Sequence, residues 1–194
     1  MIKLIHIFIF SLLSINCLLF GQLRGGFDVS GEFKLDYDST GVGETYDSES
    51  GIVIGYDEII QDLGELKFGA GLEFMLARGF GNYGEGKGSF HSVYGFGKYS
   101  LNEKAYGFVR VGYNFHTGDD DYKGDATLTG ENDYKGDATL KGGMMYAFGG
   151  GYSLTPTVSF EGLFASHSGK VVTSEDFTIK STYTRISLGL VFIF

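Results

Sequence analysis

The segment Leu66–Phe74 reads LKFGAGLEF, in which apolar residues alternate with charged residues and glycines. Because successive side chains of a β-strand point to opposite faces, this period of two predicts a strand with one apolar and one polar face. The alternation continues to Leu76 and recurs in three further segments, at 27–37, 158–165 and 185–194. These four segments are therefore expected to be amphipathic strands.

Four more strands are expected from shorter or less regular patterns, at 52–56, 93–99, 105–115 and 144–152. The last is apolar on both sides, so its sequence leaves its facing open. Composition agrees with strands throughout, because the 194 residues include 32 Gly, 18 Phe and 13 Tyr. Each Gly would cost about 1 kcal/mol relative to Ala inside a helix, and aromatic residues favour strands. The sequence predicts an all-β chain of eight strands.

The connections between these strands alternate in length. Three are short, near 61–64, 101–104 and 153–156. Four are long, at 38–50, 79–89, 116–141 and 168–180. In an up-and-down meander, every second connection lies at the same end, so one end carries the tight turns and both termini. This asymmetry is typical of bacterial outer-membrane barrels, and it predicts a closed eight-stranded antiparallel up-and-down transmembrane β-barrel.

The first residues are expected to direct export. Lys3 precedes an apolar run, Leu4–Phe20, that ends in Gly21-Gln22, and this order is typical of a secretory signal peptide. We therefore divide the chain into a cleaved signal peptide, 1–22, and an outer-membrane barrel domain, 23–194. A membrane anchor and lipid attachment at Cys17, the single cysteine, are the alternatives for this segment.

The charged residues of the polar strand faces indicate which side meets lipid. These faces are rich in glycine and serine and carry both signs of charge, as expected for a narrow lumen in which opposite charges pair. A soluble lipocalin-like barrel would instead point its apolar face inward. We expect a structural ion-pair network in the lumen, formed by Glu32, Lys34, Lys67, Glu73, Arg110, Glu161 and Arg185.

Several classes of chemistry are not expected. A net charge of −9 argues against nucleic acid as a partner, because little positive charge is present to neutralise phosphates. His91, His116 and His167 lie far apart in the sequence, so neither a metal site nor a cofactor is predicted. The run Ser166-His167-Ser168 raises the alternative of a hydrolase that modifies lipid A. Neighbouring strand residues point to opposite faces, however, so we expect a solvated loop tip and no enzymatic activity.

The longest loop contains a duplication. Residues 121–130 recur as 133–142 with nine of ten positions identical, which favours a lengthened exposed loop. An EF-hand calcium site fails because Lys123 and Gly130 replace oxygen ligands, and weak divalent binding is the remaining alternative. The acidic residues expected to be exposed in this loop are Asp119, Asp120, Asp121, Asp125, Asp133 and Asp137.

The chain resembles the small eight-stranded outer-membrane barrels of the OmpA/OmpX-like type, known as the outer membrane protein beta-barrel domain group. The resemblance covers about residues 25–194 and is carried by 66–74, Val111-Gly112-Tyr113 and 187–194. It implies an integral outer-membrane protein that is exported through the periplasm. The final aromatic residue is similar to the signal that such proteins present to the barrel-assembly machinery, which would here be formed by Leu190, Phe192 and Phe194.

These expectations lead to a functional hypothesis. The protein would be a monomeric, non-enzymatic barrel in contact with outer-membrane lipid and lipopolysaccharide. Its interior would be closed by ion pairs, and its long loops would serve surface display, adhesion or envelope integrity, with an extracellular partner as yet unknown. A narrow pore for small solutes, a soluble periplasmic binding barrel and a lipid A-modifying enzyme are the alternatives.

Overall fold

The computed structural model describes residues 21–36, 43–79, 87–118, 138–173 and 178–194. In these ranges the chain forms ten strands, and no helix there is long and apolar enough to cross a membrane. The strands are β1 (Gly21–Asp36), β2 (Gly43–Asp47), β3 (Gly51–Asp62), β4 (Leu66–Met75), β5 (Arg78–Gly79), β6 (Lys87–Ser100), β7 (Ala105–Gly118), β8 (Ala138–Thr155), β9 (Val158–Thr173) and β10 (Thr178–Ile193).

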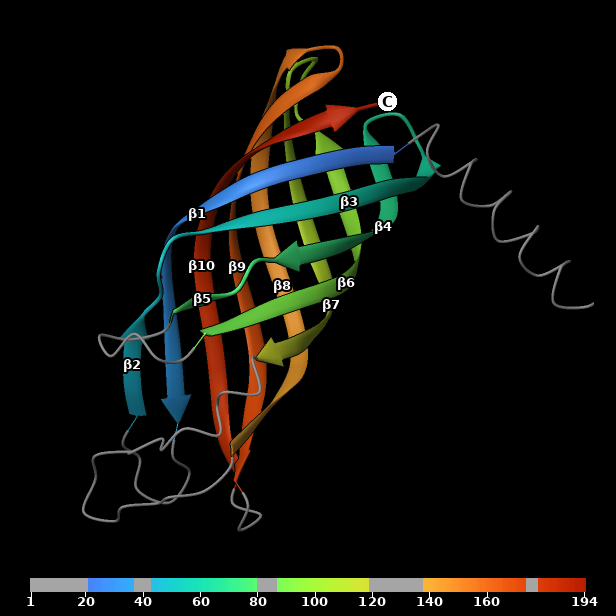
Figure 1. Ribbon diagram of the computed structural model, residues 1–194. Coiled ribbons are helices and arrows are strands. Elements are labelled where there is room, and N and C mark those ends of the chain that lie inside the picture. Colours follow the sequence, from blue (N-terminus) through green and yellow to red (C-terminus); the bar gives the residue numbers. More distant parts are fainter. Residues whose placement is uncertain (1–20, 37–42, 80–86, 119–137, 174–177) are drawn as a thin grey trace, which may run out of the picture.

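Eight long strands form a closed antiparallel barrel (Figure 1). Each strand pairs with the next long strand in the chain, in the order β1, β3, β4, β6, β7, β8, β9, β10. Pairing of β10 with β1 closes the barrel, with partners from Gln22–Ile193 to Asp36–Lys180. The short strands β2 and β5 pair beside β1 and β6. The predicted closed up-and-down barrel of eight strands is confirmed.

One end of the barrel carries tight turns and the C-terminus, as the connection lengths predict (Figure 1). In the β3–β4 turn, Gly64 has φ +82° and its amide donates to Asp62 Oδ1 at 2.9 Å. A positive φ favours Gly, and an Asp side chain that accepts two residues on is typical of turns. The amide of Phe194 donates to the carbonyl of Gly21 at 3.2 Å, so the last residue lies beside the start of β1.

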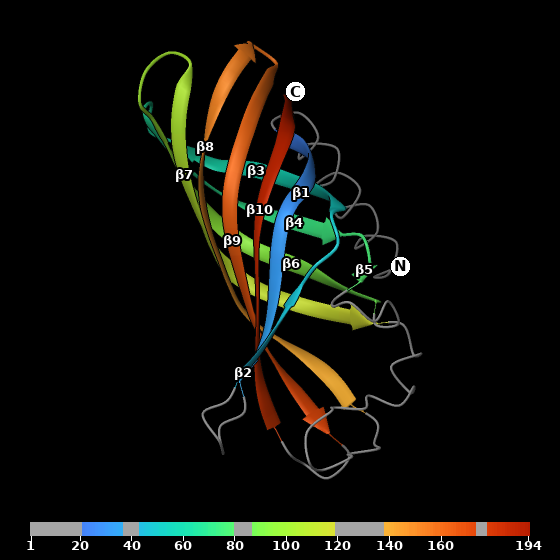
Figure 2. The same ribbon diagram turned by 90° about the vertical axis from the view of Figure 1, so that its left-hand side faces the viewer.

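At the other end, several strands are longer than the sequence predicts. The connection expected at 168–180 is largely strand, because β9 runs to Thr173 and β10 begins at Thr178. The ends of β8, β9 and β10 continue past the tilted wall formed by β3, β4 and β6 (Figure 2). The parts of the predicted loops at 38–42, 80–86, 119–137 and 174–177 lie outside the described residues, as does residue 37 at the end of a predicted strand.

Polarity is inverted relative to a soluble barrel. Large apolar side chains point outward and are exposed, for example Phe74 at 54 %, whereas the adjacent Glu73 and Met75 are buried inside at 1 %. The sequence leaves the facing of 144–152 open, and the structure settles it. Met144 and Tyr146 point outward, whereas Met145 and Ala147 point inward. Apolar side chains on the outside and charges on the inside are the arrangement of a transmembrane barrel.

A β-bulge in β1 reverses part of the predicted facing. Asp28 pairs with Ser187 and Ser30 with Ile186, so Val29 is an extra residue on the β1 side. Such an insertion shifts the alternation by one. Beyond the bulge the apolar side chains of Phe33 and Leu35 therefore point into the barrel, where both are buried.

The predicted lumen positions of Glu32 and Lys34 are wrong for this reason. Both side chains are exposed on the outer wall. Lys34 pairs there with Asp36 at 2.8 Å, with about half of the lysine side chain accessible to solvent. Gly31 was the available signal, because a glycine inside a strand often marks a bulge.

Candidate functional site

Charged side chains fill the middle of the barrel. Four arginines and four carboxylates point inward, and none has more than 5 % of its side chain exposed. We call them the charge chain, and its members in order of contact are Arg78, Asp28, Arg185, Glu73, Arg24, Asp57, Arg110 and Glu161. Because the charge chain holds equal numbers of the two signs, its own net charge is zero.

Arg185 of β10 links the first half of the charge chain. Its guanidinium donates to Asp28 of β1 at 2.8 Å and to the carboxylate of Glu73 on β4. Asp28 also accepts from Arg78 of β5. The Ser187 hydroxyl accepts from Arg185 at 2.7 Å and contacts the same Asp28 carboxylate. Each of the two carboxylates therefore lies between two arginines. Asp28 pairs with Arg78 and Arg185, and Glu73 pairs with Arg185 and Arg24.

The second half runs from Glu73 across the barrel. Arg24 of β1 donates to Glu73 and to Asp57 of β3, both at 3.0 Å. Asp57 then accepts from Arg110 of β7 at 3.3 Å, and Arg110 donates to Glu161 of β9 at 3.1 Å. Seven strands contribute to an unbroken series of alternating charges. Ion pairs that are buried this deeply are tolerated when geometry and additional hydrogen bonds satisfy them.

Aromatic side chains support the charges. The Tyr94 hydroxyl accepts from Arg24 at 2.8 Å and donates to Asp57 at 2.5 Å, and the Tyr106 hydroxyl donates to Glu161 at 3.0 Å. The Arg110 guanidinium lies over the Phe108 ring, 4.2 Å from its centroid, in a cation–π contact. These contacts hold the ends of the long side chains in place.

Apolar clusters pack against the charge chain on both sides. One contains Tyr106 and Phe96, which come from the strand ends near the tight turns. The other lies toward the long connections and contains Phe33, Phe90 and Tyr183. The rings of Phe90 and Tyr183 stack with centroids 5.1 Å apart and planes 8° apart. The interior is therefore packed in layers of rings and ion pairs.

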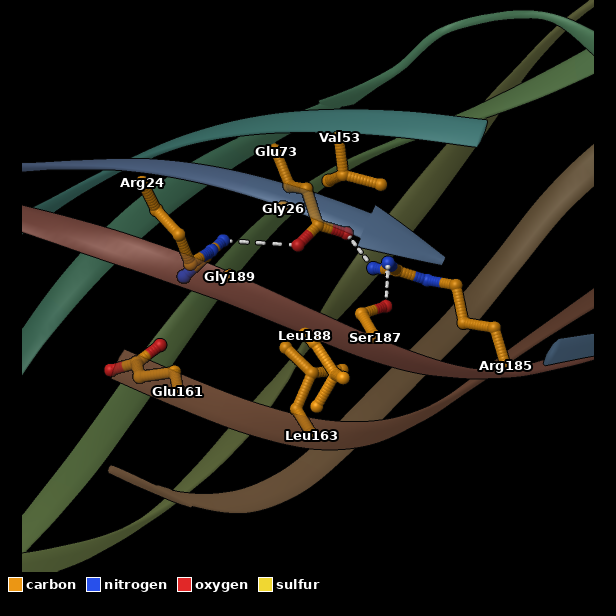
Figure 3. A pocket seen from close by; sticks show the side chains of 10 residues that line it. All are labelled: Arg24, Gly26, Val53, Glu73, Glu161, Leu163, Arg185, Ser187, Leu188 and Gly189. Carbon is orange, nitrogen blue, oxygen red and sulfur yellow. Dashed lines mark hydrogen bonds and ion pairs between the residues drawn. The ribbon is translucent and has the colours of Figure 1, made fainter. Parts of the chain in front are cut away.

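One cavity beside the charge chain is small. A cavity of about 10 Å³ lies among Arg24, Glu73, Glu161 and Arg185, lined on its apolar side by Leu163 and other residues (Figure 3). Figure 3 also shows Glu73 between Arg24 and Arg185, with Arg185 turned toward Ser187. A cavity of roughly 10–15 Å³ is the least that one water molecule requires. It has no room for a solute.

Four of the seven predicted lumen residues lie in the charge chain: Glu73, Arg110, Glu161 and Arg185. Lys67 does not join it. The Lys67 ammonium pairs with Asp62 at 2.7 Å at the tight-turn rim, where 30 % of its side chain is exposed.

Sequence reasoning missed Arg24, Asp57 and Arg78. Each lies just beyond the end of a predicted segment, at a position where the observed barrel continues with strand pairing. For Arg24 and Asp57, the signal that could have found them is a charge that continues the polar face of an adjacent segment. Arg78 has the parity of the apolar Leu76, so alternation would have placed it outside; the break in strand pairing at Leu76 and Ala77 turns it inward. Asp28 was on the predicted polar face of its segment but had no assigned partner.

The prediction of a solvated loop tip at Ser166-His167-Ser168 is wrong. His167 lies in β9, is fully buried and accepts a hydrogen bond at Nε2 from Arg185 Nε at 3.3 Å. Its pairing partner on β10 is Tyr183, so it belongs to the interior packing. A Ser–His contact is found instead on β6, where Ser89 Oγ lies 3.4 Å from His91 Nε2.

Two other sets of predicted residues have different outcomes. The acidic loop residues Asp119–Asp137 lie outside the described residues. Leu190 and Phe192 point outward near the end of β10 and are each 40 % exposed, and Phe194 is 65 % exposed. Their role in assembly stays a prediction.

Over the ranges that the structure describes, no group of three or more His, Cys, Asp or Glu side chains could hold a metal ion.

The strand order and the inverted polarity define the class of protein. An eight-stranded antiparallel barrel with an apolar exterior and an ion-paired interior is a small transmembrane β-barrel of the OmpA/OmpX-like type. This class resides in bacterial outer membranes, with short turns on the periplasmic side and long loops outside. The chain is accordingly an integral outer-membrane barrel protein.

Comparison with known proteins gives the following similarities. Neisserial surface protein A has 17 % identity and a TM-score of 0.49 over 90 % of this chain and 97 % of that chain. Ail, the attachment invasion locus protein of Yersinia pestis, has 11 % identity and a TM-score of 0.49 over 89 % and 98 %. OprG from Pseudomonas aeruginosa has 14 % identity and a TM-score of 0.47 over 90 % and 95 %. No protein-family model and no curated protein sequence matches the chain.

Proposed function

We propose that this protein is a closed, non-enzymatic outer-membrane barrel that displays its long loops at the cell surface for adhesion or envelope integrity. The charge chain is the observation that supports closure. Its eight members bridge the lumen from Arg78 to Glu161 without a gap in the pairing. The barrel then acts as a rigid support, and the activity resides in what its loops contact.

Energetics favour a permanent seal over a gate. To open a path, a solute would have to separate buried ion pairs, and breaking one such pair by removing a partner costs about 3–5 kcal/mol. Arg185 and Arg24 each pair with two carboxylates, so displacement of either disturbs two contacts. The narrow pore remains the second candidate, with Glu73, Glu161, Arg110 and Arg185 as its gate.

Planar-bilayer recording tests closure directly. We expect the refolded full chain to give no stable single-channel steps. The variant Arg110→Met/Glu161→Met removes one whole pair and leaves Asp57 paired with Arg24, and it should also remain silent because methionine fills similar volume. Steady conductance of the wild-type protein that changes size in this variant would establish a pore and refute closure.

The display role needs a separate test at the loop end. Replacing residues 119–137 by a short Gly/Ser linker removes one copy of the duplication and part of the other but leaves β7 and β8 intact. We expect normal folding, seen as heat-modifiable migration on gels, together with loss of attachment to host cells or of resistance to membrane stress. If the variant fails to fold, or if attachment and stress resistance are both unchanged, the display role of this loop is refuted.

The remaining parts of the proposal concern chemistry and partners. The protein is a monomer that uses the barrel-assembly machinery during biogenesis and contacts outer-membrane lipid and lipopolysaccharide. It has no catalytic residue and no cofactor. Mass spectrometry of lipid A after expression should show no change. A mass change that is lost on substituting His91 or His167 would contradict the non-enzymatic proposal.

A further inference from the structure

Each tight turn of the barrel carries an exposed leucine. Leu63 follows the last residue of β3, Leu101 follows the last residue of β6, and Leu154 lies next to the last residue of β8. We call these residues the turn leucines. Together with Ile60 and Phe194 at the same end, they are the five most exposed large apolar side chains of the described residues. A single exposed leucine needs no explanation, whereas a set that gathers at one end of a molecule indicates a contact surface.

The turn leucines continue the outward faces of their strands. Tyr99 of β6 and Tyr152 of β8 are both 49 % exposed, and each precedes a turn leucine by two residues. The amide of Leu101 donates to the carbonyl of Ala105 at 2.8 Å, so the β6–β7 ladder continues through this leucine. Side chains two residues apart on a strand share a face and lie about 7 Å apart. The turn leucines therefore extend the outward apolar side chains of the long strands, which we call the apolar belt, beyond the tyrosines.

The height of the apolar belt indicates that lipid reaches the turn leucines. On β8, outward apolar side chains begin at Met144 and end at Leu154, which lies ten residues further on, or about 33 Å along the strand. A strand tilt of roughly 40° converts this length to a height of about 25 Å, which matches the apolar band of outer-membrane barrels. A belt that ended at Tyr152 would be only about 20 Å tall. The leucine level therefore completes the surface that lipid covers.

The turn leucines also lie around the whole barrel. Their turns join six of the eight long strands, and Phe194 follows β10 and lies beside the start of β1. A membrane meets every side of a barrel at one level, whereas a soluble partner would contact one side. Continuity with the apolar belt indicates the same occupant, because lipid surrounds the belt.

Tyrosine–carboxylate pairs occur on the outer surface at this end. The Tyr99 hydroxyl donates to Glu65 at 3.2 Å, and the Tyr56 hydroxyl donates to Glu58 at 2.5 Å. Tyrosine is enriched at membrane interfaces because its ring contacts apolar chains while its hydroxyl meets a polar partner. Glu58 precedes Ile60 near the end of β3, and its hydrogen bond partly replaces the water that lipid excludes. These pairs fit the boundary between acyl chains and headgroups.

We propose that the turn leucines insert into the inner leaflet of the outer membrane and anchor the tight-turn end of the barrel there. The anchor sets how far the opposite end projects. β8 begins at Ala138, six residues beyond Met144, or about 20 Å along the strand. The ends of β8, β9 and β10 then stand outside the outer leaflet (Figure 2). This inference goes beyond the display function and does not depend on whether the lumen is closed.

Tryptophan fluorescence measures the depth of each position. The sequence contains no Trp, so one introduced Trp reports on one site. Leu101→Trp and Leu154→Trp are compared in the full chain, refolded into phosphatidylcholine vesicles. The controls are Leu188→Trp in the middle of the apolar belt and Thr178→Trp at the exposed start of β10. The quenchers are lipids brominated on the upper or the lower part of the acyl chain, and iodide on both sides of the vesicle.

The proposal predicts a different quencher for each level. Upper-chain bromine should quench both turn positions at least about twofold more strongly than iodide does. Lower-chain bromine should be the best quencher of Leu188→Trp, and only iodide should quench Thr178→Trp. If iodide quenches the turn positions as strongly as Thr178→Trp, the proposal is overturned and the turns are open to a soluble partner.

A second measurement is needed because tryptophan itself favours the interface. Leu101→Ser/Leu154→Ser should raise the unfolding equilibrium constant in vesicles about tenfold or more, because it removes apolar surface from lipid. Leu101→Met/Leu154→Met should leave that constant within about twofold of the wild-type value. Heat-modifiable migration shows that each variant is folded before denaturation. Equal constants for the serine and methionine variants would also overturn the proposal.

Discussion

The protein contains two kinds of ion pair with similar distances and different surroundings. In the charge chain, the Arg24–Asp57 contact is 3.0 Å and no more than 5 % of either side chain is exposed. At the rim, the Lys67–Asp62 contact is 2.7 Å, with 30 % and 51 % of the side chains exposed. Distance alone therefore does not rank them. Water screens the rim pair and solvates either partner if the other is lost, whereas neither occurs in the lumen.

Connectivity adds a second difference. Arg24, Arg110, Arg185 and the carboxylates between them each pair with two opposite charges on different strands. Lys34 and Lys67 at the rims are each seen in one ion pair. Loss of one internal member therefore disturbs several strands at once. The lumen charges therefore connect several strands, whereas each rim pair is partly exposed to water and connects only its two residues.

The largest effect is expected in the middle of the charge chain. Arg185→Met leaves the Asp28 and Glu73 carboxylates short of one partner each, and it should lower the free energy of unfolding by about 3–5 kcal/mol. Urea titration of the protein in lipid vesicles measures this value. Lys34→Met removes the same charge from the rim and should cost less than about 1 kcal/mol. Equal losses in the two variants would remove the distinction between lumen and rim.

The β1 bulge supplies the next test, because it decides which residues of β1 face the lumen and which face the outside. Phe33→Ala empties a buried position and should cost about 3–5 kcal/mol, whereas Lys34→Ala on the outer wall should cost less than about 1 kcal/mol. The same urea titration applies. The opposite order would mean that the regular alternation of the sequence continues through β1 without a bulge.

Two glycines allow the packing of the inner wall to be compared with that of the outer wall. A Cβ at Gly112 would meet the Val93 carbonyl and the backbone of Tyr94, whereas nothing lies within 4 Å of a Cβ at Gly25. Gly112→Ala should therefore destabilise the barrel by about 1–3 kcal/mol through overpacking. Gly25→Ala should leave it unchanged or slightly more stable. Heat denaturation followed by gel mobility ranks the two, and similar transition temperatures would contradict the packing difference.

The smallest effect is expected at the tight-turn rim. A hydrogen bond from Lys67 lowers the pKa of the Asp62 carboxyl, assisted by the Gly64 amide. A lowered pKa gives stability that is present above the unfolded-state pKa and is lost as the pH falls through the folded-state pKa. Asp62→Asn should therefore shift the urea midpoint only slightly at pH 7, and by less as the pH falls below the ordinary pKa of an aspartate. A larger shift at acidic pH would have the wrong sign for this contact.

The sequence predicted the barrel more completely than its interior. The strand count, strand order and inverted polarity could be predicted because each depends on local alternation and on connection lengths. The ion-pair network could be predicted only in part. Glu73 and Arg110 lie inside regular segments, whereas Arg24 and Asp57 lie just beyond segments whose ends local patterns define poorly. His167 was misplaced for the same reason, since β9 continues through a run without apolar alternation.

By itself, the sequence determined that this chain forms amphipathic strands of a membrane barrel, because a period of two and the alternating connection lengths admit few other arrangements. Tertiary structure decided which charges meet. An extra residue at Val29 shifts the facing of half a strand, and closure of β10 on β1 brings Arg185 beside Asp28, which is 157 residues away in the sequence. The physical reason is that facing follows from local geometry, whereas pairing across a lumen depends on the register of all eight strands.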